Sequence, residues 1–389
     1  MTSSTKHISR VAIGLLQDEF ELCGEFQIFQ GWTEVLRETG IELIVFGPSG
    51  RNLRASGFQC HPSGEPLIQK AIDQWTFIRV ALGCAEEVDL LHIFLPTPNF
   101  LWIADRIKLR SGKPVLVHCI AEQATLSKEE WRRQLREAPR FHLIRWIAAH
   151  FLPVGRFLCD GYVTGSQVLS DQLKRLGCPE ERVIVLPGPL PLEKPLDEVS
   201  KQLGIWVSER PTFVYLGHFL ASKGVQPLIQ SMTFLPFQIR LLLVWSGLGN
   251  RPRVERLIRR LHLEARIRIV DQIVHRTQIC SRAVGIVTPF PMSYGQMSPP
   301  AVVLEAFRAG VPVLTSRIAS LRELVNDGKT GCFVNPHNPK DIAAKMIFLL
   351  SQPDLIESMR IAQRQMFADM QHQIRPLDVY HRFMNTTRE

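Results

Sequence analysis

The chain has 389 residues, of which 45% are hydrophobic and 21% are charged, and this composition excludes an intrinsically disordered chain. The length is enough for two ordinary domains, each with a substantial hydrophobic core. The formal net charge of +9 favours an anionic partner, such as nucleic acid, an anionic membrane or a phosphorylated substrate, without choosing among them.

The first half of the chain alternates short apolar runs with helical patterns. Strands are expected at 11–16, 41–46, 88–95, 114–118, 162–164 and 183–186. Helices are expected between them at 25–39, 67–84, 98–111 and 166–176. Buried strands separated by helices are typical of a parallel, doubly wound sheet, which we assign to a first domain at residues 1–188. Ligands of such sheets bind beyond the carboxyl ends of the strands, which here are followed by segments 17–24, 96–99 and 118–123.

A proline-rich stretch at 186–195 interrupts this alternation. Four prolines in ten residues form no packed element, and the strand-helix pattern resumes only at Thr212. We therefore predict a linker at 189–211 and a second domain at 212–370.

The second half repeats the pattern of the first. Strands are expected at 213–216, 239–245, 267–270, 285–288, 311–315 and 330–334. Helices are expected at 224–232, 250–261, 277–283, 299–309, 341–350, 354–370 and 376–384. The predicted fold class is therefore α/β, with two doubly wound, Rossmann-like domains.

The segment 292–316 combines a loop, a helix and a strand. Ser298 is expected to cap a helix that begins at Pro299 and stops at Gly310. Glu305 then points its carboxylate back toward the helix N-terminus. That end of a helix offers free N–H groups and partial positive charge to a phosphate, and a carboxylate one turn deeper can accept hydrogen bonds from ribose hydroxyls.

The sequence 302–316 resembles the donor-site core of the retaining GT-B glycosyltransferases, family 4 in particular. That family carries two glutamates eight positions apart, and Glu305 matches the second, which binds the ribose of a nucleotide-sugar. The first falls at Met297, and Pro299 and Pro300 stand where the family has Phe-Gly. Proline has no N–H to offer a diphosphate, so the resemblance implies altered sugar and phosphate contacts in this chain.

Two basic positions extend the resemblance. Gly217-His218, followed by Lys223-Gly224, resembles the family's Gly-Arg and Lys-Gly, whose two cations hold the donor diphosphate. Lys223 matches the family, whereas His218 replaces an arginine and offers fewer hydrogen bonds. Lys223 is therefore expected to stabilise the departing diphosphate, and Gly217 and His218 to contact the donor.

Two further groups of donor contacts are expected in the second domain. Gly247 and Gly249 follow a strand and allow the close backbone approach that a phosphate- or base-binding turn needs, although a plain turn explains them nearly as well. The helix N-terminus at Ala301 and Val302 is expected to face the diphosphate.

Several candidates also have purely structural interpretations. Lys223 fits a solvated lysine in a strand-to-helix turn, and Glu305 fits an ion pair with Arg308 on a solvated helix face. His118 ends a strand where the family often has a His-Gly pair that borders the sugar, but a histidine there is as often structural. We count His118 with Lys223 as a catalytic candidate and assign Ser166 to a helix N-cap.

An arginine-rich and aromatic segment runs from Trp131 to Phe157. Its arginines lie at positions 132, 133, 136, 140, 145 and 156. Arginines beside large aromatics suit a surface that rests on anionic lipid, and many members of the family use lipid-linked acceptors. The alternative is a pair of helices with aromatics in the core and arginines in solvent.

Cysteine usage and the chain ends bear on the cellular compartment. The eight cysteines include no Cys-x-x-Cys pair, which argues against a zinc site or a disulfide framework and for a reducing compartment. We expect no signal peptide, since the first residues are polar, and no run reaches the roughly 18 to 20 apolar residues of a membrane span. We expect a cytoplasmic protein, peripheral at the inner face of the membrane, with no nucleic-acid partner.

The resemblance implies a GT-B arrangement in which two domains face a cleft and a helix within 371–389 crosses back to the first domain. It implies a retaining glycosyltransferase that moves a sugar from a nucleotide-sugar to a glycan or lipid-linked acceptor, without a metal or other cofactor. The departures at Met297, Pro299, Pro300 and His218 are consistent with a distinct subfamily or with the alternative, a glycosyltransferase-like binding or partner subunit that has lost catalysis.

Overall fold

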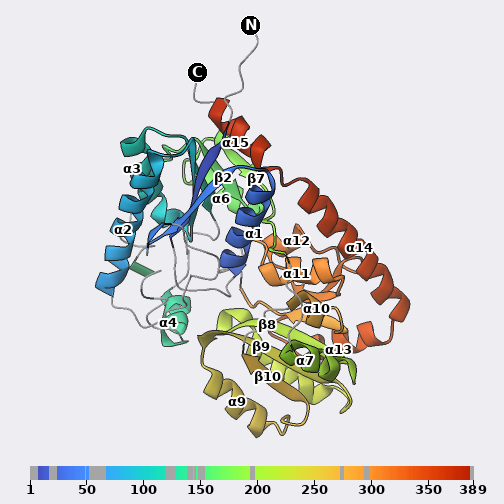
Figure 1. The fold of residues 1–389 in the computed structure, drawn as a ribbon. Helices are drawn as coiled ribbons and strands as arrows, with labels where there is room; N and C mark the ends of the chain where they lie inside the picture. The colour runs from blue at the N-terminus through green and yellow to red at the C-terminus, as the bar shows by residue number, and fades with distance from the viewer. Residues whose placement is uncertain are drawn as a thin grey trace. The chain divides into compact units, whose positions relative to one another are not determined.

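The computed structural model describes residues 8–16, 24–48, 50–51, 67–119, 128–137, 143, 146–147, 154–192, 198–271, 276–292 and 298–385. The chain divides into two compact units, each an α/β sandwich (Figure 1). The first unit comprises 1–126, 140–192 and 371–389, and the second comprises 127–139 and 193–370. The predicted α/β class with two doubly wound domains is confirmed.

The first unit is built on a seven-stranded sheet. Its strands are β1 (Arg10–Leu15), β2 (Glu42–Gly47), β3 (Gly50–Arg51), β4 (Leu90–Leu95), β5 (Val115–Cys119), β6 (Gly161–Thr164) and β7 (Val183–Val185). Their order is β3-β2-β1-β4-β5-β6-β7, and every pairing is parallel except that of β3 with β2. Both β4 and β5 are buried along their whole length, as continuous apolar runs predict for a covered parallel sheet.

Helices of the first unit cross between these strands. They are α1 (Gly24–Glu38), α2 (Leu67–Ala85), α3 (Leu101–Ser111) and α6 (Gln167–Arg175), with α15 (Pro376–Asn385) added from the end of the chain. Gly112 ends α3 in the left-handed conformation that glycine favours. Ser166 caps α6 by accepting a hydrogen bond from the Leu169 N–H, as predicted.

The last helix, α15, completes the core of the first unit. The Tyr380 hydroxyl lies 3.1 Å from Nδ1 of His92, and both residues are fully buried. A Cβ atom at Gly161 would lie 2.5 Å from the Phe383 ring, so only glycine leaves room for this helix. Tyr380 and Phe383 of α15 therefore pack onto β4 and β6.

The second unit is built on a six-stranded, fully parallel sheet. Its strands are β8 (Thr212–Phe219), β9 (Arg240–Gly249), β10 (Ile267–Asp271), β11 (Gly285–Thr288), β12 (Val313–Ser316) and β13 (Gly331–Val334). Their order is β10-β9-β8-β11-β12-β13. The winding direction reverses between β8 and β11, which is where doubly wound sheets bind their ligands.

The helices of the second unit include one within the predicted linker. They are α4 (Lys128–Glu137), α7 (Glu198–Ser208), α8 (Val225–Ser231), α9 (Arg251–Arg260), α10 (Arg276–Cys280), α11 (Ala301–Ala309), α12 (Ala319–Arg322), α13 (Pro339–Leu350) and α14 (Pro353–His372). The predicted linker at 189–211 contains α7, in which Leu203 and Val207, four residues apart, bury one face of the helix.

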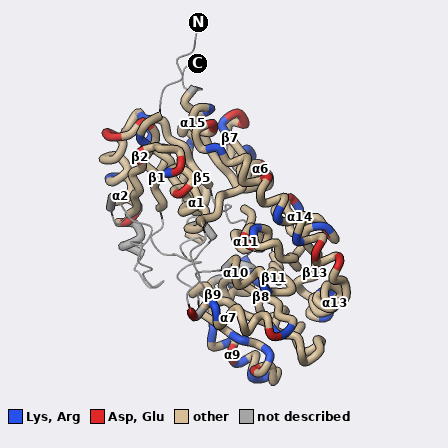
Figure 2. The backbone as a smooth tube through the Cα atoms, turned by 45° about the vertical axis from the view of Figure 1, so that its right-hand side comes forward, with Lys and Arg blue, Asp and Glu red and all other residues tan. Residues whose placement is uncertain are grey.

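Positive charge is concentrated on α9 of the second unit (Figure 2). Five of its ten residues are arginine, and Asn250 caps it by accepting a hydrogen bond from the Arg253 N–H. Its apolar residues, Val254, Leu257 and Ile258, face the core, so the arginines occupy the solvated side.

Candidate functional site

The carboxyl edge of the second sheet at β8 and β11 brings several predicted residues together. Gly217 and His218 lie near the end of β8, and Lys223 lies in a short 3-10 helix just beyond it. The loop after β11 leads into α11, whose N-terminus lies at the same edge because all strands of the sheet are parallel.

Strand β8 continues past the predicted stop at Gly217. It ends at Phe219, and its pairing with β9 shifts register between Gly217 and Phe219. The Tyr215 hydroxyl donates a 2.7 Å hydrogen bond to the His218 carbonyl, which fixes the backbone at this irregularity. His218 is half-buried there, so its side chain lies at the sheet edge and stays partly accessible to solvent.

The turn that carries Lys223 is pressed against the turn after β11. Gly224 has a φ of 71°, and a Cβ atom at this position would lie 1.9 Å from the Pro289 carbonyl oxygen. A side chain at residue 224 would therefore separate the two turns. The Lys223 ammonium lies 5.4 Å from the centre of the Phe290 ring, within the range of a cation–π contact. The half-buried Lys223 is thus held beside the loop that leads toward α11.

Helix α11 begins two residues later than predicted. Its N-cap is Pro300 and its first residue is Ala301, so the prediction of Ser298 as cap and Pro299 as first helical residue is wrong. The reason is that Pro300 disfavours the helical conformation in the residue before it. Gly310 ends the helix in the left-handed conformation, as predicted.

Two buried or half-buried positions lie at the start of this helix. Ala301 is buried and Val302 is half-buried, and their N–H groups belong to the first turn, where helices leave donors for a ligand. The two preceding prolines add no donors.

Glu305 is buried in α11, with 2% of its surface exposed. The structural alternative placed Glu305 on a solvated helix face. This face is not solvated, because Glu305 is buried. Arg308 donates hydrogen bonds from Nε and Nη2 to the Thr277 hydroxyl, at 3.1 and 2.9 Å. A buried carboxylate is stabilised by polar or charged neighbours, and the position of Glu305 one turn inside this helix is compatible with a functional role.

Gly247 and Gly249, at the end of β9, differ in their surroundings. Gly249 has a φ of 94°, and a Cβ atom there would lie 2.2 Å from the Phe219 carbonyl oxygen, so it allows β8 and β9 to pair past the predicted strand end. Gly247 has a φ of 89° and is exposed, with open space around the position of a Cβ atom. Close packing of strands explains Gly249, whereas Gly247 is accessible to a ligand.

His118 lies in the core of the first unit. It is 3% exposed and stacks on Phe94, with ring centres 4.5 Å apart. The rings of His92 and Trp32 lie 5.9 and 5.8 Å away. Burial lowers the pKa of His118 to about 3, so the imidazole is neutral at physiological pH. These contacts are those of a core histidine.

The arginine-rich segment is only partly within the described residues. Trp131 is 3% exposed and Phe157 is 5% exposed, so both aromatics face protein. Arg132 and Arg136 are exposed on α4. Residues 138–142, 144–145 and 148–153 lie outside the described residues, as do Met297 and the predicted ligand-facing segments 17–23 and 120–123.

Within the ranges given above, no group of three or more His, Cys, Asp or Glu side chains is arranged to hold a metal ion. No helix in this part of the chain combines the length and the apolar composition that crossing a membrane requires.

Comparison with known proteins identifies the fold and the second unit. Residues 198–366 match the family model for glycosyl transferases group 1, and this range falls within the second unit. The chain carries a group 1 glycosyltransferase domain on a GT-B fold. HepE of Anabaena, solved in complex with UDP-glucose, has a TM-score of 0.63 at 16% identity, covering 98% of this chain and 99% of HepE. Sucrose-phosphate synthase of Thermosynechococcus elongatus has a TM-score of 0.67 at 19% identity, covering 93% and 94%.

Curated relatives match over shorter stretches. Alpha-D-kanosaminyltransferase of Streptomyces kanamyceticus is 28% identical over 164 residues, which is 42% of each chain. D-inositol 3-phosphate glycosyltransferase of Xylanimonas cellulosilytica is 27% identical over 198 residues, which is 46% of each chain. The chain thus spans less than half the length of these relatives.

Phe290, which contacts Lys223 in the group 1 domain, was not predicted as a site residue. Phe290 lies two residues after the end of β11, at the carboxyl edge where the winding direction reverses. An aromatic residue just after a predicted strand at that position is a signal that could have identified it.

Proposed function

We propose that the protein is a glycosyltransferase that transfers a sugar from a nucleotide-sugar to a glycan or lipid-linked acceptor. The observation that carries the proposal is Glu305, a buried carboxylate one turn inside α11 at the edge where the group 1 domain would bind its ligand. Support also comes from HepE, which shares the GT-B fold and was solved with UDP-glucose bound.

Each described residue of the site has a separate task in this proposal. Glu305 accepts hydrogen bonds from the ribose hydroxyls, and the first N–H groups of α11 face the diphosphate. Lys223 lies across the sheet edge beside Phe290 and stabilises the negative charge that develops on the departing diphosphate. His218 adds a hydrogen-bond donor where the family has an arginine.

The reaction proceeds with retention of anomeric configuration and without a bound metal. Catalysis then consists mainly of positioning and of charge stabilisation by Lys223 and the helix N-terminus. His118 has no part in this mechanism, because a core histidine with a pKa of about 3 is a poor partner for proton transfer near neutral pH.

Replacement of Glu305 by glutamine tests the proposal directly. Glutamine keeps the shape of the side chain but replaces one acceptor oxygen and removes the charge. A hydrogen bond to a charged group contributes about 1.5–3 kcal/mol, so we expect nucleotide-sugar affinity to fall roughly ten- to a hundredfold. Binding is measured by thermal shift across UDP- and GDP-sugars, since a ligand at a hundred times its Kd stabilises by about 2.7 kcal/mol.

Glu357→Gln, an exposed position on α14, is the matched control and should bind like the wild type. If Glu305→Gln binds its donor normally but melts early, Glu305 is structural and the proposed site is wrong.

One observation favours a second candidate, a binding or partner subunit without catalysis. Pro299 and Pro300 precede α11 immediately, so the approach to this helix lacks two backbone donors. Such a protein would bind a nucleotide-sugar and release no sugar from it. Detection of sugar transfer or donor hydrolysis that depends on Lys223 would exclude this candidate.

A further inference from the structure

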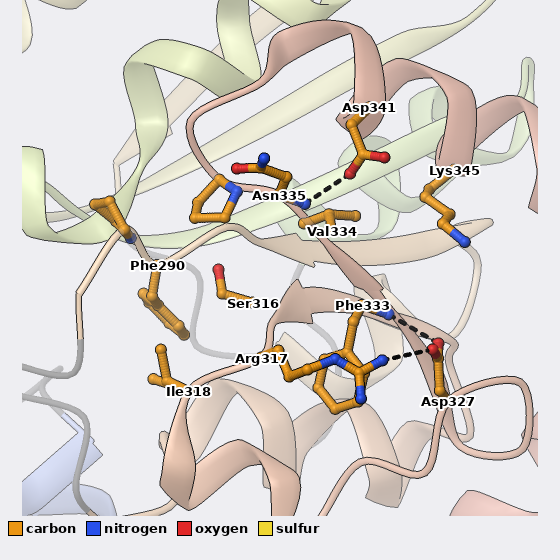
Figure 3. A pocket seen from close by; sticks show the side chains of 12 residues that line it. Phe290, Ser316, Arg317, Ile318, Asp327, Phe333, Val334, Asn335, Asp341 and Lys345 are labelled. Atoms are coloured by element: carbon orange, nitrogen blue, oxygen red, sulfur yellow. Dashed lines mark hydrogen bonds and ion pairs between the residues drawn. The ribbon is translucent and has the colours of Figure 1, made fainter.

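A pocket of about 560 Å³ opens at the carboxyl ends of β11, β12 and β13 in the second unit (Figure 3). Its volume is in the range of small-molecule sites. Its lining includes none of the predicted donor residues, and Phe290 is the described residue that borders both this pocket and Lys223. A nucleotide held by Lys223 and Glu305 would therefore leave the pocket available.

Ser316 supplies a buried polar group that points into this pocket. It ends β12 and is 2% exposed, and its Oγ has no hydrogen-bond partner among the described residues. Figure 3 shows this oxygen directed into the space between Phe290 and Asn335. A buried hydroxyl is normally hydrogen-bonded, so this one is available to a ligand that donates or accepts a hydrogen bond.

Arg317 is fixed at one side of the pocket. Its Nη2 donates to Asp327 at 2.9 Å, and its guanidinium lies 4.3 Å from the centre of the Phe333 ring. The other Asp327 oxygen accepts a 3.1 Å hydrogen bond from the Phe333 N–H. Arg317 thus keeps donors for a ligand while its charge is balanced by Asp327.

Asp341 and Lys345 stand on the opposite side, on α13. An Asp341 oxygen accepts a 2.6 Å hydrogen bond from the Asn335 N–H, and Lys345 lies one turn further along the helix. The lining therefore carries two cations and two carboxylates and is close to neutral. A neutral lining offers little attraction for a diphosphate.

We propose that this pocket binds a neutral saccharide that is not attached to the nucleotide, a choice of ligand class that rests on the proposed function. Sugar hydroxyls donate and accept hydrogen bonds, and the pocket offers donors at Arg317 and Lys345, an acceptor at Asp341 and both at Ser316. The C–H faces of a sugar ring pack on apolar surface, which Phe290 and Ile318 supply.

The test uses the full chain and saturation-transfer difference NMR with glucose, galactose, mannose, N-acetylglucosamine, maltose and lactose. Each saccharide is measured with and without UDP. We expect at least one to bind without nucleotide. Ser316→Ala and Lys345→Met each remove one hydrogen bond, so affinity should fall about two- to tenfold.

Matched controls separate the pocket from its surroundings. Ser320→Ala changes another buried serine four residues away, and Lys340→Met changes an exposed lysine of the same helix; neither lines the pocket, and both should leave saccharide binding unchanged. UDP binding should be the same in all four variants.

Several results would overturn the proposal. These are absence of binding by every saccharide, binding of the nucleotide-linked sugar alone, preference for glucose 6-phosphate or inorganic phosphate, or equal effects of pocket and control variants. Failure of the proposed function looks different. In that case no nucleotide-sugar gives a thermal shift, while Ser316-dependent saccharide binding persists.

Discussion

The buried histidine pair of the first unit makes a quantitative prediction about acid stability. Burial lowers the pKa of His118 from its ordinary value of 6.5 to about 3. Burial also lowers the pKa of His92, and the neighbouring His118 lowers it further. The Tyr380 hydroxyl is in hydrogen-bonding contact with His92 Nδ1. In the unfolded chain both imidazoles take up a proton near pH 6.5, whereas in the folded protein they stay neutral.

The unfolded state therefore binds more protons than the folded state below pH 6.5, and stability falls as the pH falls. Each histidine contributes a slope of about 1.36 kcal/mol per pH unit once the pH is well below 6.5. Between pH 6.5 and 4.5, His118 alone should lower the free energy of unfolding by about 2 kcal/mol. The loss continues until the pH reaches the folded-state pKa of about 3.

His118→Phe isolates this contribution. Phenylalanine preserves the stacking on Phe94 and removes Nδ1, a buried atom without a hydrogen-bond partner among the described residues. The larger ring adds some packing strain, but that cost does not depend on pH. Urea unfolding at pH 6.5, 5.5 and 4.5 should show a variant whose stability falls less steeply, by about 1 kcal/mol per pH unit.

His337→Gln, an exposed histidine in the second unit, serves as the control and should keep the wild-type slope. Parallel pH curves for wild type and His118→Phe would refute the reasoning, because they would mean that His118 takes up its proton equally in both states.

Two further predictions concern metal and membrane. Transfer activity should survive excess chelator, because Lys223 and the α11 N-terminus carry the diphosphate charge; loss of turnover that a divalent ion restores would contradict this. The protein should sediment with anionic vesicles at low salt and leave them at 1 M salt, where the Debye length is about 3 Å. Arg132→Glu with Arg136→Glu should weaken this binding by about 1 kcal/mol or more per residue, while Arg256→Glu with Arg259→Glu on α9 should not. Wild-type protein that stays in the low-salt supernatant would rule out the membrane surface.

Most elements of the fold could be predicted because their patterns are local. Buried runs such as 90–95 and 285–288 contain the strands β4 and β11, and glycine stops such as Gly310 end helices where predicted. The errors fall where two local signals compete. Glycines 217 and 247 were expected to end strands, yet β8 and β9 continue through them, because glycine also permits the irregular pairing found there. Prolines around 190 masked the burial pattern of α7.

The candidate site could be predicted only in part. Lys223 and Glu305 were found because each carries a short motif at a strand end or a helix start. The saccharide pocket was not found, because Phe290, Ser316 and Asp341 are far apart in the chain and meet only where three strand ends align. His118 shows the limit of such local signals. Its position at a strand end suggested a ligand, but the rings that enclose it come from Trp32, Phe94 and His92, whose positions no local pattern reveals.

The return of α15 to the first unit has a consequence for synthesis. Strand β7 completes the first sheet at Val185, but Tyr380 and Phe383 emerge only after the roughly 200 residues of the second unit. At about 5–20 residues per second, the ribosome needs about 10–40 s to supply them. During that time the surface around His92 and Gly161 has no cover from α15. A chain cut just after α14 would keep every strand of both sheets but would lack the part of the first core that α15 supplies. Truncation at the carboxyl end therefore destabilises the amino-terminal unit.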